Sequence, residues 1–201
     1  MIKQLYTILF FFSCIHVANG QQASVRFVLN DTFQSVKRNF KDSALKALRI
    51  EAEVLSSQEF KDSLIKYTFS CKNNTVSPCD CLHENNTCNE AVRIPGLTVY
   101  NALLRDSVVN IKLIVAKASF RLRHFSKTYG SSCPCYYITT TYTWWLANDD
   151  LPLTYYYAAH LAHEYAHITG YIHGDQPLSD DVAYVVGNIV ENILKRRAGV
   201  L

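Results

Sequence analysis

The chain has 201 residues, of which 49% are hydrophobic and 18% are charged, with 7 glycines and 5 prolines. This composition excludes a disordered tail, a collagen-like fibre and a low-complexity linker, and the length predicts one domain. The formal net charge of +3 is too small for a nucleic-acid-binding surface, and the only basic block that stands out is Lys195-Arg196-Arg197 near the end. We therefore expect no nucleic-acid partner.

The first 20 residues are typical of a secretory signal peptide. Lys3 precedes the apolar run 5–12, and Ala18-Asn19-Gly20 provides small residues at the two positions that a signal peptidase reads. The apolar run is too short for a transmembrane helix, and no later stretch is long enough. We predict a signal peptide at 1–20 and one secreted domain at 21–201, extracellular or, in a bacterium, periplasmic.

Loss of the signal peptide would remove Cys14 and leave six cysteines, an even number that suits an oxidised, secreted domain. Lipidation of Cys14 as a lipoprotein is the alternative for this end. We expect three disulfides that staple the polar loop 70–89, with the second of two Cys-x-Cys pairs reaching back to the first. A metal site of four thiolates is the alternative, which an oxidising compartment disfavours. The cysteines concerned are Cys71, Cys79, Cys81, Cys88, Cys133 and Cys135.

In the first half of the chain, an extended stretch at 24–29 is expected to lead into a long helix. Its apolar face recurs every three or four residues, at Phe33, Val36, Phe40, Ala44, Leu48, Ala52 and Leu55. A second helix is expected near Ser56, where Ser56 and Glu59 would form a capping box. That helix should bury Phe60, Leu64 and Ile65.

The second half predicts two strands followed by two helices, which indicates an α+β domain. Residues 108–115 and 136–145 are β-branched or aromatic and predict strands. The second of them either pairs with an extended peptide or is an ordinary interior strand. A helix is expected from 153 to 169, after Pro152 and before Gly170. Asp180 and Asp181 open a last helix, with an inward face of Val182, Val185, Val186, Ile189, Ile193 and Leu194.

Two further aromatic features are ambiguous in the sequence. Trp144 and Trp145, together with the tyrosines at 155–157, either line a hydrophobic cleft or pack in the core. Tyr184 either stabilises an oxyanion or forms the floor of a site, or it is simply a half-buried helix residue.

The most informative segment is His163-Glu164-Tyr165-Ala166-His167, followed by Gly170 and His173. Residues four apart lie on one helix face, so His163 and His167 can direct two imidazoles at one ion. Gly170 lets the chain leave the helix and brings His173 round as a third ligand. Zinc suits three neutral imidazoles and one water. Glu164 then lies beside the metal, where it can accept a proton from the water.

This motif resembles the extended zinc signature HExxHxxGxxH of the metzincin metallopeptidases, over 161–174. A looser likeness in element order covers 108–197, and the chain looks most like small secreted zincin-like proteins with a V-x-Y-x-V-G stretch, here 182–187. The resemblance implies a zincin-like fold, with N-terminal helices, a small twisted sheet, an active-site helix and a C-terminal helix. It implies Zn²⁺ on His163, His167 and His173, Glu164 as general base, and an edge strand that holds the substrate.

The chain departs from the metzincin pattern because it has no methionine after Met1. Metzincins carry a methionine in a turn beneath the metal, where it supports the site without being a ligand. Other side chains near the motif could hydrogen-bond the imidazoles and orient them. His160 either orients the site or is solvated, and Asp175, Asp180 and Asp181 could each orient an imidazole, with nothing to rank them.

We therefore predict a secreted zinc metallopeptidase whose partner is a peptide or protein substrate. The alternatives are a non-catalytic secreted binding domain with a structural zinc site, and a disulfide-stabilised domain without metal. Glu164 argues against a purely structural site, which would not need it.

Overall fold

The computed structural model describes residues 23–71, 92–133, 136–146, 152–173 and 177–200. The predicted signal peptide at 1–20 and most of the cysteine-rich loop lie outside these residues, as do Cys135 and Asp175. The predictions that rest on them stay predictions.

The main sheet is mixed, with four principal strands in the order β1-β5-β7-β6. Strands β1 (Arg26–Leu29), β5 (Val108–Ala116) and β7 (Ile138–Tyr142) run parallel, and β6 (Gly130–Cys133) is antiparallel to β7. The short β2 (Gln34–Ser35) pairs with the far end of β5. Among the described strands, β6 therefore lies at one edge of the sheet.

Strand β5 has the alternating pattern of a half-buried strand, which confirms the prediction for 108–115. Four side chains on one face are at most 1% exposed, and those on the other face are partly or fully accessible. The buried ones are Val109, Ile111, Leu113 and Val115. One face of the sheet is thus part of the core.

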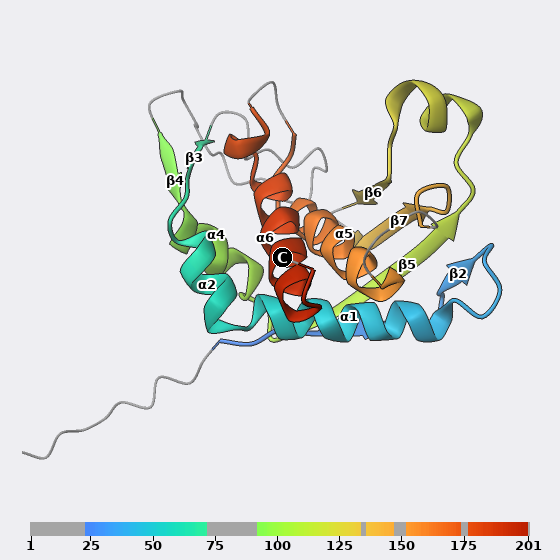
Figure 1. Cartoon of the computed structure of the whole chain (residues 1–201), viewed down its shortest axis with the longest axis horizontal. Coiled ribbons are helices and arrows are strands. Elements are labelled where there is room, and N and C mark those ends of the chain that lie inside the picture. The colour runs from blue at the N-terminus through green and yellow to red at the C-terminus, as the bar shows by residue number, and fades with distance from the viewer. Residues whose placement is uncertain (1–22, 72–91, 134–135, 147–151, 174–176, 201) are drawn as a thin grey trace, which may run out of the picture.

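Three long helices form most of the rest of the core. Helix α5 (Leu153–Ile168) packs against both α1 (Lys41–Leu55) and α6 (Val182–Arg197), as Figure 1 shows. The predictions for α5 and α6 are confirmed, including the inward face of α6, all of which is buried. The mixture of helices with small sheets agrees with the predicted α+β class.

A group of smaller elements lies beside α6. Helix α2 (Gln58–Leu64) and helix α4 (Gly96–Leu103) adjoin a two-stranded antiparallel sheet of β3 (Thr68–Ser70) and β4 (Arg93–Pro95) (Figure 1). The sequence had predicted only α2 among these. Two short helical turns, η2 (Leu122–Ser126) and η4 (Leu178–Asp180), complete the described elements.

The first long helix begins later than predicted. Its apolar periodicity began at Phe33, but Ser35 pairs with Val115 of β5 and Val36 is 64% exposed. Asn39 then has a φ of +54°, which a helix does not allow. Because these contacts with β5 take the chain into a strand, only the part of the pattern from Phe40 onward belongs to α1.

The predicted start of the second helix is also shifted. The hydroxyl of Ser57, rather than that of Ser56, accepts the Phe60 amide as the helix cap. The Ser56 hydroxyl instead accepts the Val25 amide at the start of the sheet. Ile65 follows the helix and is exposed, so the prediction that it is buried was wrong, whereas Phe60 is buried as predicted.

The strand predicted at 136–145 is shorter, and it is interior. It is reduced to β7 because Tyr137 has a φ of +51° and the chain turns after Tyr142. Since β7 lies between β5 and β6, it cannot be the strand that pairs with a substrate. The interior-strand alternative is therefore correct.

The acidic side chain of Glu51, on α1, is buried in the core of the protein. Glu51 is fully buried, and neither of its carboxyl oxygens has a hydrogen-bond partner among the described residues. Burial raises the pKa of Glu51 well above its ordinary value, because the ionised form would lose its hydration.

None of the described helices is long and apolar enough to cross a membrane.

Candidate functional site

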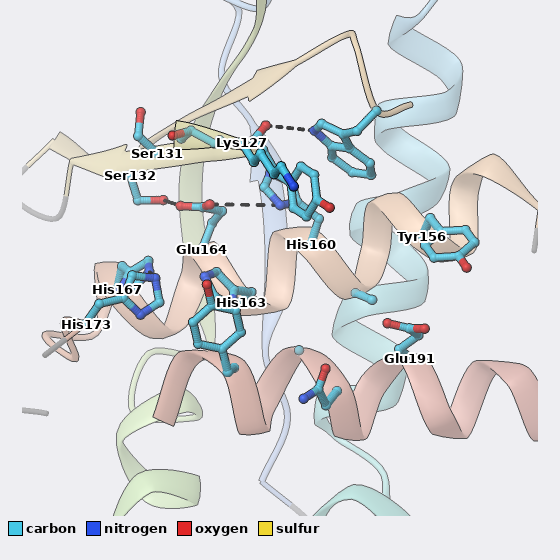
Figure 2. Close-up of a pocket in the computed structure, with 18 of the residues that line it drawn as sticks. Lys127, Ser131, Ser132, Tyr156, His160, His163, Glu164, His167, His173 and Glu191 are labelled. Atoms are coloured by element: carbon cyan, nitrogen blue, oxygen red, sulfur yellow. Dashed lines mark hydrogen bonds and ion pairs between the residues drawn. The ribbon is translucent and has the colours of Figure 1, made fainter. Parts of the chain in front are cut away.

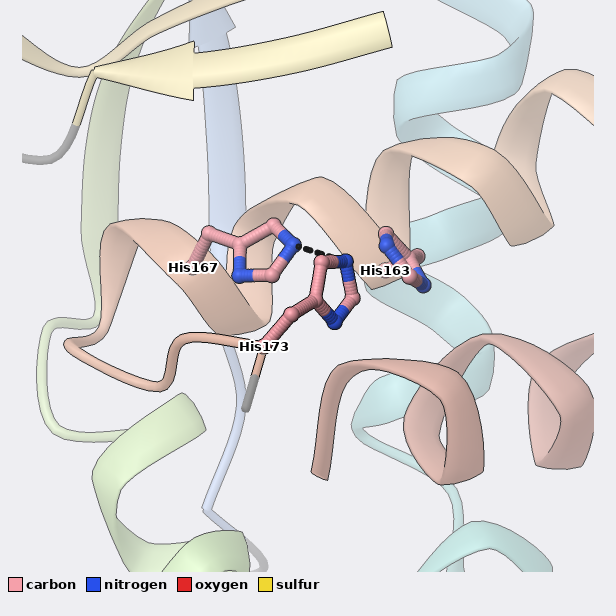
Figure 3. A group of neighbouring side chains, drawn as sticks. All are labelled: His163, His167 and His173. Atoms are coloured by element: carbon pink, nitrogen blue, oxygen red, sulfur yellow. Dashed lines mark hydrogen bonds between the residues drawn. The ribbon is translucent and has the colours of Figure 1, made fainter. Parts of the chain in front are cut away.

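The three histidines of the motif converge at the end of α5. His163 and His167 lie one turn apart on α5, and Gly170, with a φ of +106°, ends the helix and turns the chain back toward them. Their ring centroids and that of His173 are 4.4 to 5.1 Å apart (Figure 3). One nitrogen from each ring can be chosen so that all three lie within 4.8 Å of one another. The three side chains could therefore hold a metal ion.

Two of the three rings also bond a group outside the cluster. His167 Nδ1 faces the Tyr171 carbonyl, and His173 Nδ1 lies 2.8 Å from an Asp181 carboxylate oxygen. Such acceptors take a ring N–H and leave the other nitrogen with a lone pair. His167 and His173 are therefore oriented from behind, by Tyr171 and by Asp181.

Two of the ring nitrogens have the spacing of tetrahedral zinc ligands. The Nε2 atoms of His167 and His173 are 3.1 Å apart. Two imidazole nitrogens that bind one zinc at its usual distance are about 3.3 Å apart in tetrahedral geometry. Burial, followed by repulsion between neighbouring imidazoles, lowers the pKa of His163. Burial also lowers the pKa of His167, so both rings are neutral at pH 7, as metal ligands must be.

Glu164 lies beside the histidines, but its carboxyl group points toward strand β6. Its carboxylate is buried, and one oxygen accepts a 2.7 Å hydrogen bond from the Ser132 hydroxyl on the edge strand β6 (Figure 2). Burial raises the pKa of Glu164 to about 7, while the Ser132 donor works in the opposite direction. A carboxyl group with that pKa exchanges protons readily near neutral pH.

His160 is a buried part of the same site, which excludes the alternative that it is solvated. Its Nδ1 lies 3.9 Å from the second oxygen of Glu164, and its ring packs edge-on against Trp145. Gly130 of β6 lies directly over His160, because a Cβ at Gly130 would be 2.6 Å from the imidazole Nε2. Glu164 is thus flanked by Ser132 on one side and His160 on the other.

Tyr184 lies at the site in the first turn of α6. Its ring centroid is 4.9 Å from that of His163 and 4.8 Å from that of His173, and the side chain is 36% exposed. Three residues further on, Gly187 lets α6 approach α5 closely, because a Cβ there would be 3.1 Å from the Cβ of His163. Helix α6 therefore forms the floor beneath the histidines.

The structure distinguishes Asp181 from Asp180 as the residue that orients an imidazole. Asp181 caps α6 and bonds His173, whereas Asp180 accepts the Ser70 amide and pairs with Arg93 away from the cluster. Sequence reasoning did not identify Ser132 or Gly187 as part of the site. Ser132 gave no sequence signal because its contact with Glu164 depends on how β6 pairs with β7. Gly187 had a weak signal, as the last residue of V-x-Y-x-V-G.

A cleft of about 850 Å³ contains these groups and extends beyond them. It runs between β6, α5 and α6, with Tyr156 and Glu191 at the end away from His167 and His173 (Figure 2). The aromatic residues are divided between the two predicted roles. Trp145 and Tyr156 line the cleft, but Tyr157 is fully buried in the core.

No protein-family model matches the chain, and searches of curated proteins and of solved structures found no match. The chemistry of the site is therefore inferred from its own residues and geometry.

Proposed function

We propose that this protein is a secreted zinc-dependent metallopeptidase, with His163, His167 and His173 as the zinc ligands. The observation that carries the proposal is the convergence of three imidazoles beside a buried carboxyl group in one cleft. Zinc held by three imidazoles supplies Lewis-acid activation of water and of a carbonyl group. The remaining steps fall to residues of the chain.

Glu164 is the proposed general base and then general acid. It takes a proton from the attacking water and returns it to the leaving amine of the cleaved peptide bond. Ser132 holds one carboxylate oxygen by its 2.7 Å hydrogen bond and leaves the other for proton transfer. Tyr184, whose ring packs against two of the ligands, is the proposed donor to the oxyanion.

The arrangement of the sheet supports a peptide as the substrate. Strand β6 lines the cleft and lies at an edge of the sheet as far as the structure describes it, so an extended chain could pair with its outer side. An antiparallel edge strand above an active-site helix is also in keeping with the zincin-like fold that the motif implies. Because no methionine follows Met1, Tyr184 and Gly187 are the proposed floor in place of the metzincin methionine.

A peptide-library digestion with and without a chelator tests this function. We expect cleavage that the chelator abolishes and added zinc restores. Glu164→Gln should keep the zinc and lose cleavage, and Glu53→Gln, a surface carboxylate on α1, should cleave normally. Zinc binding without any cleavage would favour a non-catalytic domain with a structural zinc site, and normal cleavage by Glu164→Gln would refute its role.

A further inference from the structure

We propose that the β5–β6 loop, residues 117–129, docks on an anionic lipid surface. The loop includes η2 and extends beyond the sheet, away from α2, α4 and the β3–β4 pair (Figure 1). The proposal rests on exposed aromatic rings in this loop, and on cations that pair with no carboxylate in the part of the chain that the structure describes. It is independent of the zinc site and of the proposed peptidase activity.

The aromatic part of the loop is exposed. Phe120 is 70% exposed and Phe125 is 77% exposed, and no other phenylalanine is exposed in the described part of the chain. The two rings contact each other edge-on, and Phe120 also packs on the ring of His124. Two adjacent phenylalanines held out in solvent cost free energy unless something apolar covers them.

The same loop carries concentrated positive charge. Lys117, Arg121, Arg123 and Lys127 are all exposed, and none of them pairs with a carboxylate within the described ranges. The sequence contains no acidic residue between Asp106 and Asp149. The C-terminal basic triplet differs, because Lys195, Arg196 and Arg197 each pair with a glutamate. The sequence analysis had singled out only that triplet.

An anionic bilayer complements both features at once. Phenylalanine rings can enter the boundary between headgroups and acyl chains, while arginine and lysine reach the lipid phosphates with their long side chains. A nucleic acid or an acidic polysaccharide would match the charge but would leave the two rings without apolar cover. Because Ser126 and Lys127 also line the cleft, docking would place its opening next to the membrane.

Co-sedimentation of the full secreted chain with vesicles tests the proposal. We expect binding to phosphatidylcholine vesicles that contain phosphatidylserine, little binding to pure phosphatidylcholine, and weaker binding as salt rises. Replacing both arginines (Arg121→Gln with Arg123→Gln) should weaken binding by roughly fivefold per charge. Replacing both rings (Phe120→Ser with Phe125→Ser) should weaken it by on the order of tenfold per ring.

The matched control removes two charges from the paired cluster, as Arg196→Gln with Arg197→Gln, and should bind like the wild type. Circular dichroism checks that every variant is folded. His167→Ala should also bind vesicles normally, so a failed metallopeptidase proposal leaves this one standing. Absence of binding to the anionic vesicles would overturn the proposal. Equal binding by the phenylalanine variant, or binding to heparin without binding to vesicles, would overturn it too.

Discussion

The hydrogen bond between Ser132 and Glu164 gives a quantitative test of the site. Ser132→Ala removes a 2.7 Å donor from a buried carboxylate. A hydrogen bond to a charged group contributes about 1.5–3 kcal/mol. If the bond positions Glu164 for proton transfer, kcat/KM for a cleaved peptide should fall about 10- to 150-fold. Zinc content should not change, because Ser132 contacts none of the three histidines in the described structure.

The pH dependence of kcat/KM distinguishes the loss of a contact that positions Glu164 from general damage to the fold. Because the Ser132 donor lowers the pKa of Glu164, its loss should move the acid limb of kcat/KM to higher pH. Ser132→Thr keeps a hydroxyl on a strand and should recover most of the activity at the original pH. Ser131→Ala, a neighbour whose side chain points away from Glu164 in Figure 2, is the matched control. A Ser132→Ala enzyme with wild-type rate and pH profile would refute the reasoning.

Three further predictions concern the support of the site and the core. Asp181→Ala removes the acceptor of His173 and should weaken zinc affinity about 10- to 100-fold in a competition assay, and unchanged affinity would contradict its role. Gly187→Leu should force α6 away from His163 and lower the free energy of unfolding by about 1–3 kcal/mol in urea titrations. Glu51→Met should raise that free energy at pH 7 by about 1–3 kcal/mol, because it removes a buried carboxyl group that has no hydrogen-bond partner among the described residues. Since folding raises the pKa of Glu51, its contribution is most favourable below the unfolded-state pKa of about 4.3 and declines as the pH rises toward the folded-state pKa. The methionine variant should lack that decline, and an unchanged pH dependence of unfolding would contradict this assignment.

The parts of the fold that could be predicted are those with a long, regular pattern. Helix α5 ends at a glycine, α6 has a complete apolar face, and β5 alternates between buried and accessible side chains. The local sequence is therefore enough to predict each of these elements. The convergence of the three histidines could be predicted for the same reason, since the spacing of His163 and His167 on α5 and the turn at Gly170 are local.

The parts that could not be predicted depend on contacts distant in sequence. Strand β6 consists of small polar residues and a cysteine, so only its pairing with β7 makes it a strand. Its Ser132 meets Glu164 across 32 residues, and no spacing rule connects them. The prediction of where α1 begins was wrong for a similar reason, because the pairing of Ser35 with β5 overrides a helical pattern that begins at Phe33.

Elemental analysis of the purified protein tests the central claim most directly. After dialysis against zinc and then against buffer, the wild type should retain about one zinc ion per chain. His167→Ala should lose that zinc, and His124→Ala, an exposed histidine of the β5–β6 loop, should keep it. A wild-type protein with no affinity for zinc, or a His167→Ala variant that binds it equally well, would contradict the proposed metal centre.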